Sequence, residues 1–258
     1  MRSFLVTLAV LLAFALQPAI ALATRTSTIC TINTGLDPAC PLTAAGISAS
    51  TIVLNGSATR HENDVFGSFA WHGNQQLTLS LPIHDHLGIA GVGNAYGLGD
   101  AIVRYTKAFG KVGRLTQVAG ASVGFATGAA AFSTGRTQLA PMYALSYALG
   151  DRIALLAIAK YRFDVGGTKL QFAPRTQALT FTPRAIVDLS KSGLYFAADI
   201  SGASVTGDER YQAYQSDGTI GIARRHYGIA LTYGVPIAYF TRQNLFYHTL
   251  ILQATWRP

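Results

Sequence analysis

The sequence has few charged residues and only one long hydrophobic run. Charged residues make up 12% of its 258 residues, about half of the share that soluble domains usually carry. The hydrophobic run, Phe4–Leu16, is too short for a transmembrane helix, which needs about 20 residues. The composition therefore argues against a soluble domain and equally against a bundle of transmembrane helices, although half of the residues are apolar.

The hydrophobic run has the form of an export signal. Arg2 precedes it and Ala21-Leu22-Ala23 follows it, which supplies a positively charged start, an apolar segment and a small-residue cleavage site. We assign residues 1–23 to a signal peptide that is cleaved after Ala23, with cleavage after Ala21 as the alternative. A buried N-terminal helix is the competing interpretation of this run.

Cysteine is scarce, since Cys30 and Cys40 are the only two. In an oxidising periplasm, an even pair at this spacing is expected to form a small disulfide loop. A lipoprotein anchor at Cys30 fits less well because Ser27-Thr28-Ile29 lacks the usual lipobox, and two cysteines alone make a weak metal site. We predict a Cys30–Cys40 disulfide in a lead segment of residues 24–73, whose weak alternation leaves open whether it adds one or two strands.

Acidic residues are also few, with 12 Asp and Glu against 20 Lys and Arg. In a soluble protein this excess of positive charge would suggest a nucleic-acid partner. The basic residues are scattered and form no basic run, so we predict no nucleic-acid partner. Positive charge near anionic lipid headgroups or inside a pore accounts for the excess more simply.

The sequence is rich in period-two alternation, which a strand shows and a helix does not. In Thr137–Asp164, apolar residues take every second position on both sides of a Gly150-Asp151 turn. Each arm is longer than the five or six residues of a typical soluble strand, and strands of about 9–11 residues with an apolar face can span an outer membrane. The apolar side of the first arm consists of Leu139, Pro141, Tyr143, Leu145, Tyr147 and Leu149.

The same alternation continues to the C-terminal end of the sequence, and short turns between strands alternate with longer loops. Outer-membrane barrels show this order because their periplasmic turns are short and their outer loops long. The pattern predicts an all-β, transmembrane, antiparallel up-and-down barrel in residues 74–258. It has ten strands from Gln75 onward, or up to twelve if Ile47–Trp71 supplies a pair.

One region makes the strand count odd. Ser204–Gly218 is polar and is interpreted as a long loop, and Thr219–Tyr233 is then a single strand. Both this strand and the last one would run toward the periplasm. An additional short strand within Pro236–Arg242 would restore an even number.

Two groups of turn-forming residues precede predicted strands and resemble those of a known family. They are Gly97-Leu98-Gly99-Asp100, and Thr127-Gly128 followed by Ser133-Thr134-Gly135-Arg136 before the strand with Pro141. Together with the closing Tyr247–Trp256 strand, they make the sequence similar, from about Gln75 on, to the outer-membrane barrels of the MetA-pathway of phenol degradation, often called transporters. The resemblance implies a barrel that passes small, often aromatic, compounds and brings no catalytic residues. Arg257-Pro258 departs from the pattern, because barrels usually end on the aromatic residue that the assembly machinery recognises.

Charged residues fall on the small-or-polar side of the predicted strands. Because Arg or Lys facing lipid at mid-depth costs roughly 2–4 kcal/mol, we expect these side chains to line the lumen, the interior of the barrel. They could form a lining that sets selectivity or an Arg–Asp network that fills a narrow barrel. The residues are Arg104, Lys160, Arg162, Asp164, Arg184, Asp188 and Asp199.

The sequence suggests no convincing catalytic or metal site. His84-Asp85-His86 offers too few ligands, since a metal site prefers three or four, and we interpret it as a polar tip at the start of an outer loop. His226, Ser201 and Asp199 could be arranged as the triad of a lipid-modifying enzyme, but serine is common in this sequence. We therefore predict no enzyme, no metal and no cofactor.

The combined prediction is a single barrel in the outer membrane of a Gram-negative bacterium. It would pass or bind small, hydrophobic or aromatic, molecules. An outer-membrane lipid-modifying enzyme and a non-conducting structural barrel are the alternatives. The predicted partners are outer-membrane lipids and lipopolysaccharide, a small-molecule solute and the barrel-assembly machinery.

Overall fold

The computed structural model describes residues 37–54, 59–89, 93–129, 132–167, 175–208, 210–237 and 246–258, and within them the side chains of 85–95, 110–111 and 246–247 are not described. The predicted signal peptide and Cys30 lie outside the described residues. Within these ranges, no helix is long and apolar enough to cross a membrane.

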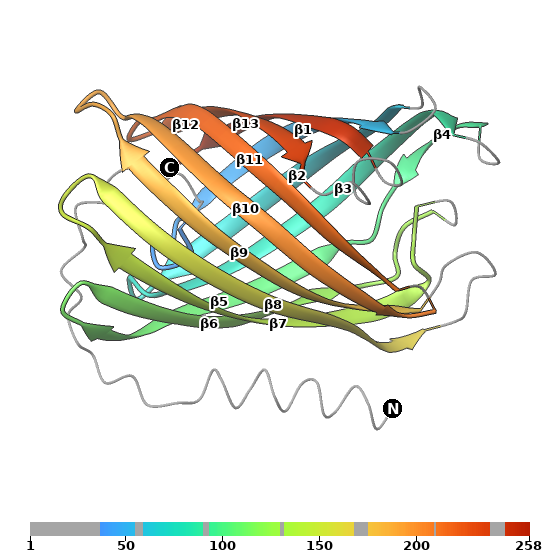
Figure 1. Ribbon diagram of the computed structural model, residues 1–258, viewed down its shortest axis with the longest axis horizontal. Coiled ribbons are helices and arrows are strands. Elements are labelled where there is room, and N and C mark those ends of the chain that lie inside the picture. Colours follow the sequence, from blue (N-terminus) through green and yellow to red (C-terminus); the bar gives the residue numbers. More distant parts are fainter. Residues whose placement is uncertain are drawn as a thin grey trace.

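The described residues form thirteen strands, each antiparallel to its neighbours. Figure 1 shows them strongly tilted around a common axis. They are β1 (Ala44–Leu54), β2 (Thr59–Trp71), β3 (Gln75–Ile89), β4 (Gly93–Leu98), β5 (Ile102–Val112), β6 (Leu115–Gly124), β7 (Arg136–Ala148), β8 (Ile153–Gly167), β9 (Thr176–Asp188), β10 (Leu194–Gly207), β11 (Tyr211–Ala223), β12 (Tyr227–Pro236) and β13 (Phe246–Trp256).

Twelve of these strands close into a barrel. β1 pairs with both β2 and β13, and β2 pairs with β3, so the ring has no open edge. The first half of β3 pairs with β5 and its second half with β4. β4 and β5 therefore follow one another along β3 as one interrupted strand. The predicted up-and-down transmembrane barrel is confirmed, and it begins at Ala44 rather than at residue 74 because β1 and β2 belong to it.

The prediction was wrong between Ser204 and Tyr233. Ser204–Gly218 is no long loop, because β10 runs to Gly207 and β11 begins at Tyr211. The turn at residues 224–226 then divides the predicted single strand into β11 and β12. The alternation was hidden because Ser216 and Gly218 take outward positions on β11, where apolar residues would have marked a strand.

The strand number is even without the short strand predicted within Pro236–Arg242. Pro236 ends β12, and residues 238–242 lie outside the described part of the chain. β11 and β12, in place of the single predicted strand, supply the one strand that was missing, and β1 and β13 pair directly to close the ring.

The short turns gather at one end of the barrel, which we call the short-turn end. They connect β2 with β3, β5 with β6, β7 with β8, β9 with β10, and β11 with β12. Four of them contain a glycine with positive φ, namely Gly73, Gly113, Gly150 and Gly193, a conformation that costs glycine nothing. β1 starts and β13 ends at the same end, which is the left end in Figure 1. This matches the periplasmic end of bacterial barrels.

The two faces of each strand differ as predicted for the central β7–β8 hairpin. Tyr143 and Tyr147 are 42% exposed on the outside, as expected for a lipid-facing surface with aromatic girdles. Ala140, Ala144 and Ala154 are at most 5% exposed and face the interior. Small inward residues leave room in the lumen for charged side chains.

Near the short-turn end the interior is packed with apolar side chains. One cluster contains Leu156, Ile186 and Tyr195, and a second contains Val118 and Ala144. Leu156 lies early in β8 and Ile186 late in β9, so both positions are close to the short turns. The lumen wall is therefore largely apolar at this end, where Asp188 is an inward charge, and the other inward charges of the strands lie further along the barrel.

Candidate functional site: the charged lumen

The seven charged residues predicted to line the lumen all take inward positions on their strands. Arg104, for example, pairs across the sheet with Ser122, and Asp188 with Tyr195, both of which are buried. The structure adds inward charges that the sequence analysis missed, although Arg60, Glu62 and Asp64 alternate with a period of two and could have been found. The added residues are Arg60, Glu62, Asp64, His84, Arg136 and Asp217.

Two ion pairs join neighbouring strands inside the lumen. Arg136 on β7 lies 3.0 Å from Asp164 on β8, and Arg184 on β9 lies 2.8 Å from Asp199 on β10. The side chains of Arg136 and Asp199 are 4% and 6% exposed. These four residues form the kind of Arg–Asp network that stabilises a barrel wall.

Carboxylates outnumber cations around Arg184. Asp217 on β11 lies directly opposite Asp199 on β10, and Asp217 accepts a hydrogen bond from Gln215. The guanidinium of Arg184 pairs with Asp199, and Asp217 adds a second carboxylate beside that pair.

Three inward cations on β5 and β8 lack such partners. Arg104, Lys160 and Arg162 take part in none of the ion pairs found among the described residues. Lys160 and Arg162 are successive inward positions of β8, and the guanidiniums of Arg104 and Arg162 both act electrostatically on the Lys160 ammonium. Arg104 points inward and is exposed, which shows that open space reaches it within the lumen.

A segment before β1 lies against the inner wall at the short-turn end. Ser146 Oγ donates to Asp37 Oδ2 over 2.9 Å, and the Leu42 backbone N–H donates to Gln76 Oε1 over 3.1 Å. Ala39 packs on the apolar cluster of Val118 and its neighbours. We call residues 37–43 the inner segment, and it narrows the lumen at this end. Cys40 is buried within it, and because Cys30 is not described, the Cys30–Cys40 pairing stays a prediction.

The Asp37 carboxyl makes docking of the inner segment sensitive to pH. Burial raises the pKa of Asp37, against the lowering effects of its hydrogen bonds from Ala39 and Ser146. A pKa that is raised in the docked state means that docking is favoured by protonation. Docking is therefore strongest in acid and weakens as the pH rises through the raised pKa.

At the opposite end, Asp100 holds the β6–β7 loop in place. Its carboxylate accepts hydrogen bonds from the Gly128 N–H (3.1 Å), the Thr134 N–H (2.9 Å) and the Thr134 hydroxyl (3.1 Å). The ring of Phe132 stacks on that of His84 with centroids 5.3 Å apart. The two turn motifs of the sequence thus meet at the gap between β4 and β5 and fold the loop back onto the lumen wall.

Glycine is required where these motifs touch. A Cβ on Gly99 would collide with the His84 ring, and a Cβ on Gly128 would lie 2.7 Å from the Gly99 carbonyl carbon. His84 itself is an inward residue of β3 that is 5% exposed, so its interpretation as a polar tip was wrong. The alternation of β3 carries it into the lumen.

Asp100→Ala is expected to destabilise the barrel by about 1.5–3 kcal/mol, because it removes a charged acceptor shared by three donors. The measurement is the midpoint of unfolding in urea. The folded fraction at each urea concentration is monitored by heat-modifiable migration in gels. Asp151→Ala, which removes an exposed carboxylate from the β7–β8 turn, is the matched control. Equal midpoints for the two variants would contradict the role of Asp100.

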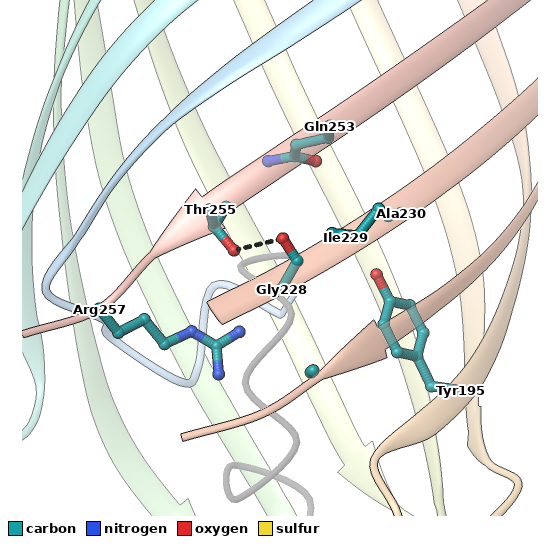
Figure 2. Close-up of a pocket in the computed structure, with 8 residues that line it drawn as sticks. Tyr195, Gly228, Ile229, Ala230, Gln253, Thr255 and Arg257 are labelled. Carbon is teal, nitrogen blue, oxygen red and sulfur yellow. Dashed lines mark hydrogen bonds between the residues drawn. The ribbon is translucent and has the colours of Figure 1, made fainter. Parts of the chain in front are cut away.

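The C-terminal tail is integrated into the short-turn end. The Arg257 N–H donates to His226 O over 2.9 Å, and its guanidinium donates to Arg224 O over 2.7 Å. Figure 2 shows Arg257, Thr255 and Tyr195 around a small pocket, with the Thr255 hydroxyl donating to Gly228 O. The pocket is about 10 Å³, room for one water molecule. The tail therefore closes the β11–β12 turn, and this pocket holds no larger ligand.

The structure does not assemble the triad considered for an enzyme. His226 lies in the β11–β12 turn, whereas Ser201 lies roughly 23 Å along β10 from its short-turn end. The Ser201 hydroxyl contacts Thr182 at 3.2 Å, and Asp199 pairs with Arg184. Among the described residues, no group of three or more His, Cys, Asp or Glu side chains could hold a metal; the side chains of Asp85 and His86 lie outside them.

A closed barrel of twelve strands with an apolar exterior and a charged lumen has the architecture of bacterial outer-membrane barrels. The COG4313 outer membrane channel from Pseudomonas putida F1 is similar in structure, with a TM-score of 0.67, 13% sequence identity, and coverage of 84% of this chain and 96% of the channel. The NanC porin gives 0.63 at 13% identity, covering 83% and 100%, and the KdgM porin 0.56 at 8%, covering 83% and 99%.

No family model and no curated protein matches the sequence. At these identities the likeness to the three solved barrels is one of fold. Membership of the MetA-pathway family, expected from the turn motifs, stays a prediction.

Proposed function

We propose that this protein is a passive channel for small molecules in the outer membrane, to which a signal peptide exports it. The observation that carries the proposal is that Arg104 takes an inward position on β5 and is nevertheless exposed. This supports a lumen that the ion-pair network does not fill at this level. The similar folds of an outer-membrane channel and two porins support the same function.

The inner segment acts in this proposal as a constriction. It is held by the Asp37–Ser146 hydrogen bond and by the contact of Ala39 with the apolar wall. A solute entering from the long-loop end would pass the charged middle of the lumen first. The hydrophobic or aromatic solutes that the family resemblance implies would meet the apolar wall near this constriction.

Single-channel recording of the refolded protein in a planar bilayer tests the proposal. The wild-type protein is expected to give discrete conductance steps. Asp37→Ala with Ser146→Ala is expected to give larger or longer openings, because the inner segment loses its anchor. Ser190→Ala, which alters a hydrogen bond confined to the exposed β9–β10 turn, is the control. Protein that is folded by gel migration yet silent in every variant would contradict a channel.

A further inference from the structure

The inward cations of β5 and β8 are not members of the Arg–Asp ion pairs that stabilise the barrel wall, so those ion pairs do not explain why they are there. The Lys160 ammonium is repelled by the guanidiniums of Arg104 and Arg162, and like charges near one another cost free energy unless counter-charge is supplied. Asp64 acts electrostatically on Arg104 from β2, but it forms no ion pair with it within the described residues. A bound anion would supply the missing charge.

We propose that Arg104, Lys160 and Arg162 form a lumen site for a small organic anion, with its carboxylate among the three cations and its apolar part on Met142 and Ile158. This assignment rests on the proposed channel function, because it places the site on the permeation path. It names the class of solute that the channel selects.

The donors that would hold the carboxylate are present. Arg162 Nη2 donates to Thr176 Oγ1 over 3.2 Å, while its Nε is buried and has no hydrogen-bond partner among the described residues. No described side chain accepts a hydrogen bond from the Lys160 ammonium or the Arg104 guanidinium. Guanidinium groups bind carboxylates through paired N–H donors, so an anion would satisfy groups that the barrel itself leaves unsatisfied.

The strands between β5 and β8 leave room for the anion. β6 and β7 separate the two groups of cations, and their inward residues Gly120, Ser122 and Ala140 are small. Side chains from β5 and β8 can therefore approach one another across these two strands. The repulsion between Arg104 and Lys160 is consistent with that approach.

Apolar side chains border the cations on the side of the short-turn end. Met142 lies directly opposite Lys160 in the β7–β8 register, and Ile158 is the next inward residue of β8. Both are partly buried against the apolar cluster of Ala108, Val118 and Ala144. This surface would favour an anion with a compact apolar body over inorganic phosphate, which has none.

Carboxylates on the opposite wall of the lumen would orient the charged end of such a solute. β11 is six strands from β5 in the ring of twelve, so Asp217 and Arg104 lie on opposite sides of the lumen. Asp199 is paired with Arg184 there, and Asp217 adds a further carboxylate. A carboxylate is therefore attracted to the β5–β8 side and repelled from the β10–β11 side.

The test measures ion selectivity and block in single channels. In a KCl gradient the wild-type reversal potential is expected to show a preference for chloride, and benzoate is expected to reduce the current more strongly than inorganic phosphate at equal concentration. Lys160→Ala with Arg162→Ala is expected to weaken benzoate block about tenfold and to reduce the chloride preference. Lys191→Ala, which removes an exposed charge from the β9–β10 turn, should change neither.

The outcomes separate this inference from the channel proposal. Normal conductance with equal benzoate block in the wild type and the double variant would overturn the anion site and leave the channel intact. Phosphate block as strong as benzoate block would overturn the apolar half of the site. If the folded barrel conducts nothing, the channel fails. Calorimetric titration of the detergent-refolded protein with benzoate then tests whether the anion site exists. The site requires that the wild type binds benzoate and that the double variant does not.

Discussion

Phe181→Arg is expected to prevent or strongly impair folding of the barrel into lipid vesicles, whereas Thr182→Arg is expected to be tolerated. Phe181 is 53% exposed on the outside in the middle of β9. Arginine facing lipid at mid-depth costs roughly 2–4 kcal/mol of folding free energy. The substitution also removes an aromatic ring from the surface that contacts lipid. The measurement is the folded fraction by gel migration, as a function of urea.

Thr182 is the matched control because it is the next residue on the same strand and faces the lumen. Its hydroxyl lies 3.2 Å from that of Ser201, and an arginine there would keep its charge in the lumen near Asp199 and Asp217. Equal loss of folding in both variants would contradict the assignment of inward and outward faces.

Arg184→Ala is expected to have the second large effect, a loss of about 3–5 kcal/mol of stability, which is the range for breaking a buried ion pair. Arg184 makes two contacts of 2.8 Å with Asp199 Oδ2. Without it, Asp199 and Asp217 face one another across the β10–β11 pair with no cation between them. The urea midpoint of unfolding measures this loss.

The double variant Arg184→Ala with Asp199→Ala supplies the control. It removes both members of the ion pair and leaves Asp217 alone, so it is expected to be more stable than the single Arg184→Ala variant. A double variant less stable than the single one would show that the Arg184–Asp199 contact contributes little and that packing explains the loss.

The sequence alone determined the class of fold and the side of the strand on which most residues lie. The period of two is a local property, so it can be recognised without knowing which strands pair. It places Tyr143, Tyr147 and Leu155 on the outer face, and Ala140, Ala144 and Lys160 on the inner face. The same logic placed the predicted lumen charges on inward positions. It failed at Ser216 and Gly218 because outward residues there carry no apolar signal.

Only the tertiary structure decided which of these residues meet. Ser146 reaches Asp37 across 109 positions of the sequence, and Thr134 reaches Asp100 across 34. Alternation fixes the face of a strand, but register, closure and the curvature of the ring decide which inward side chains lie together. Arg136 and Arg184 thereby obtain carboxylate partners, whereas Arg104, Lys160 and Arg162 form none of the ion pairs among the described residues. Two sets of residues with the same sequence pattern thus become a stabilising network and a candidate solute site.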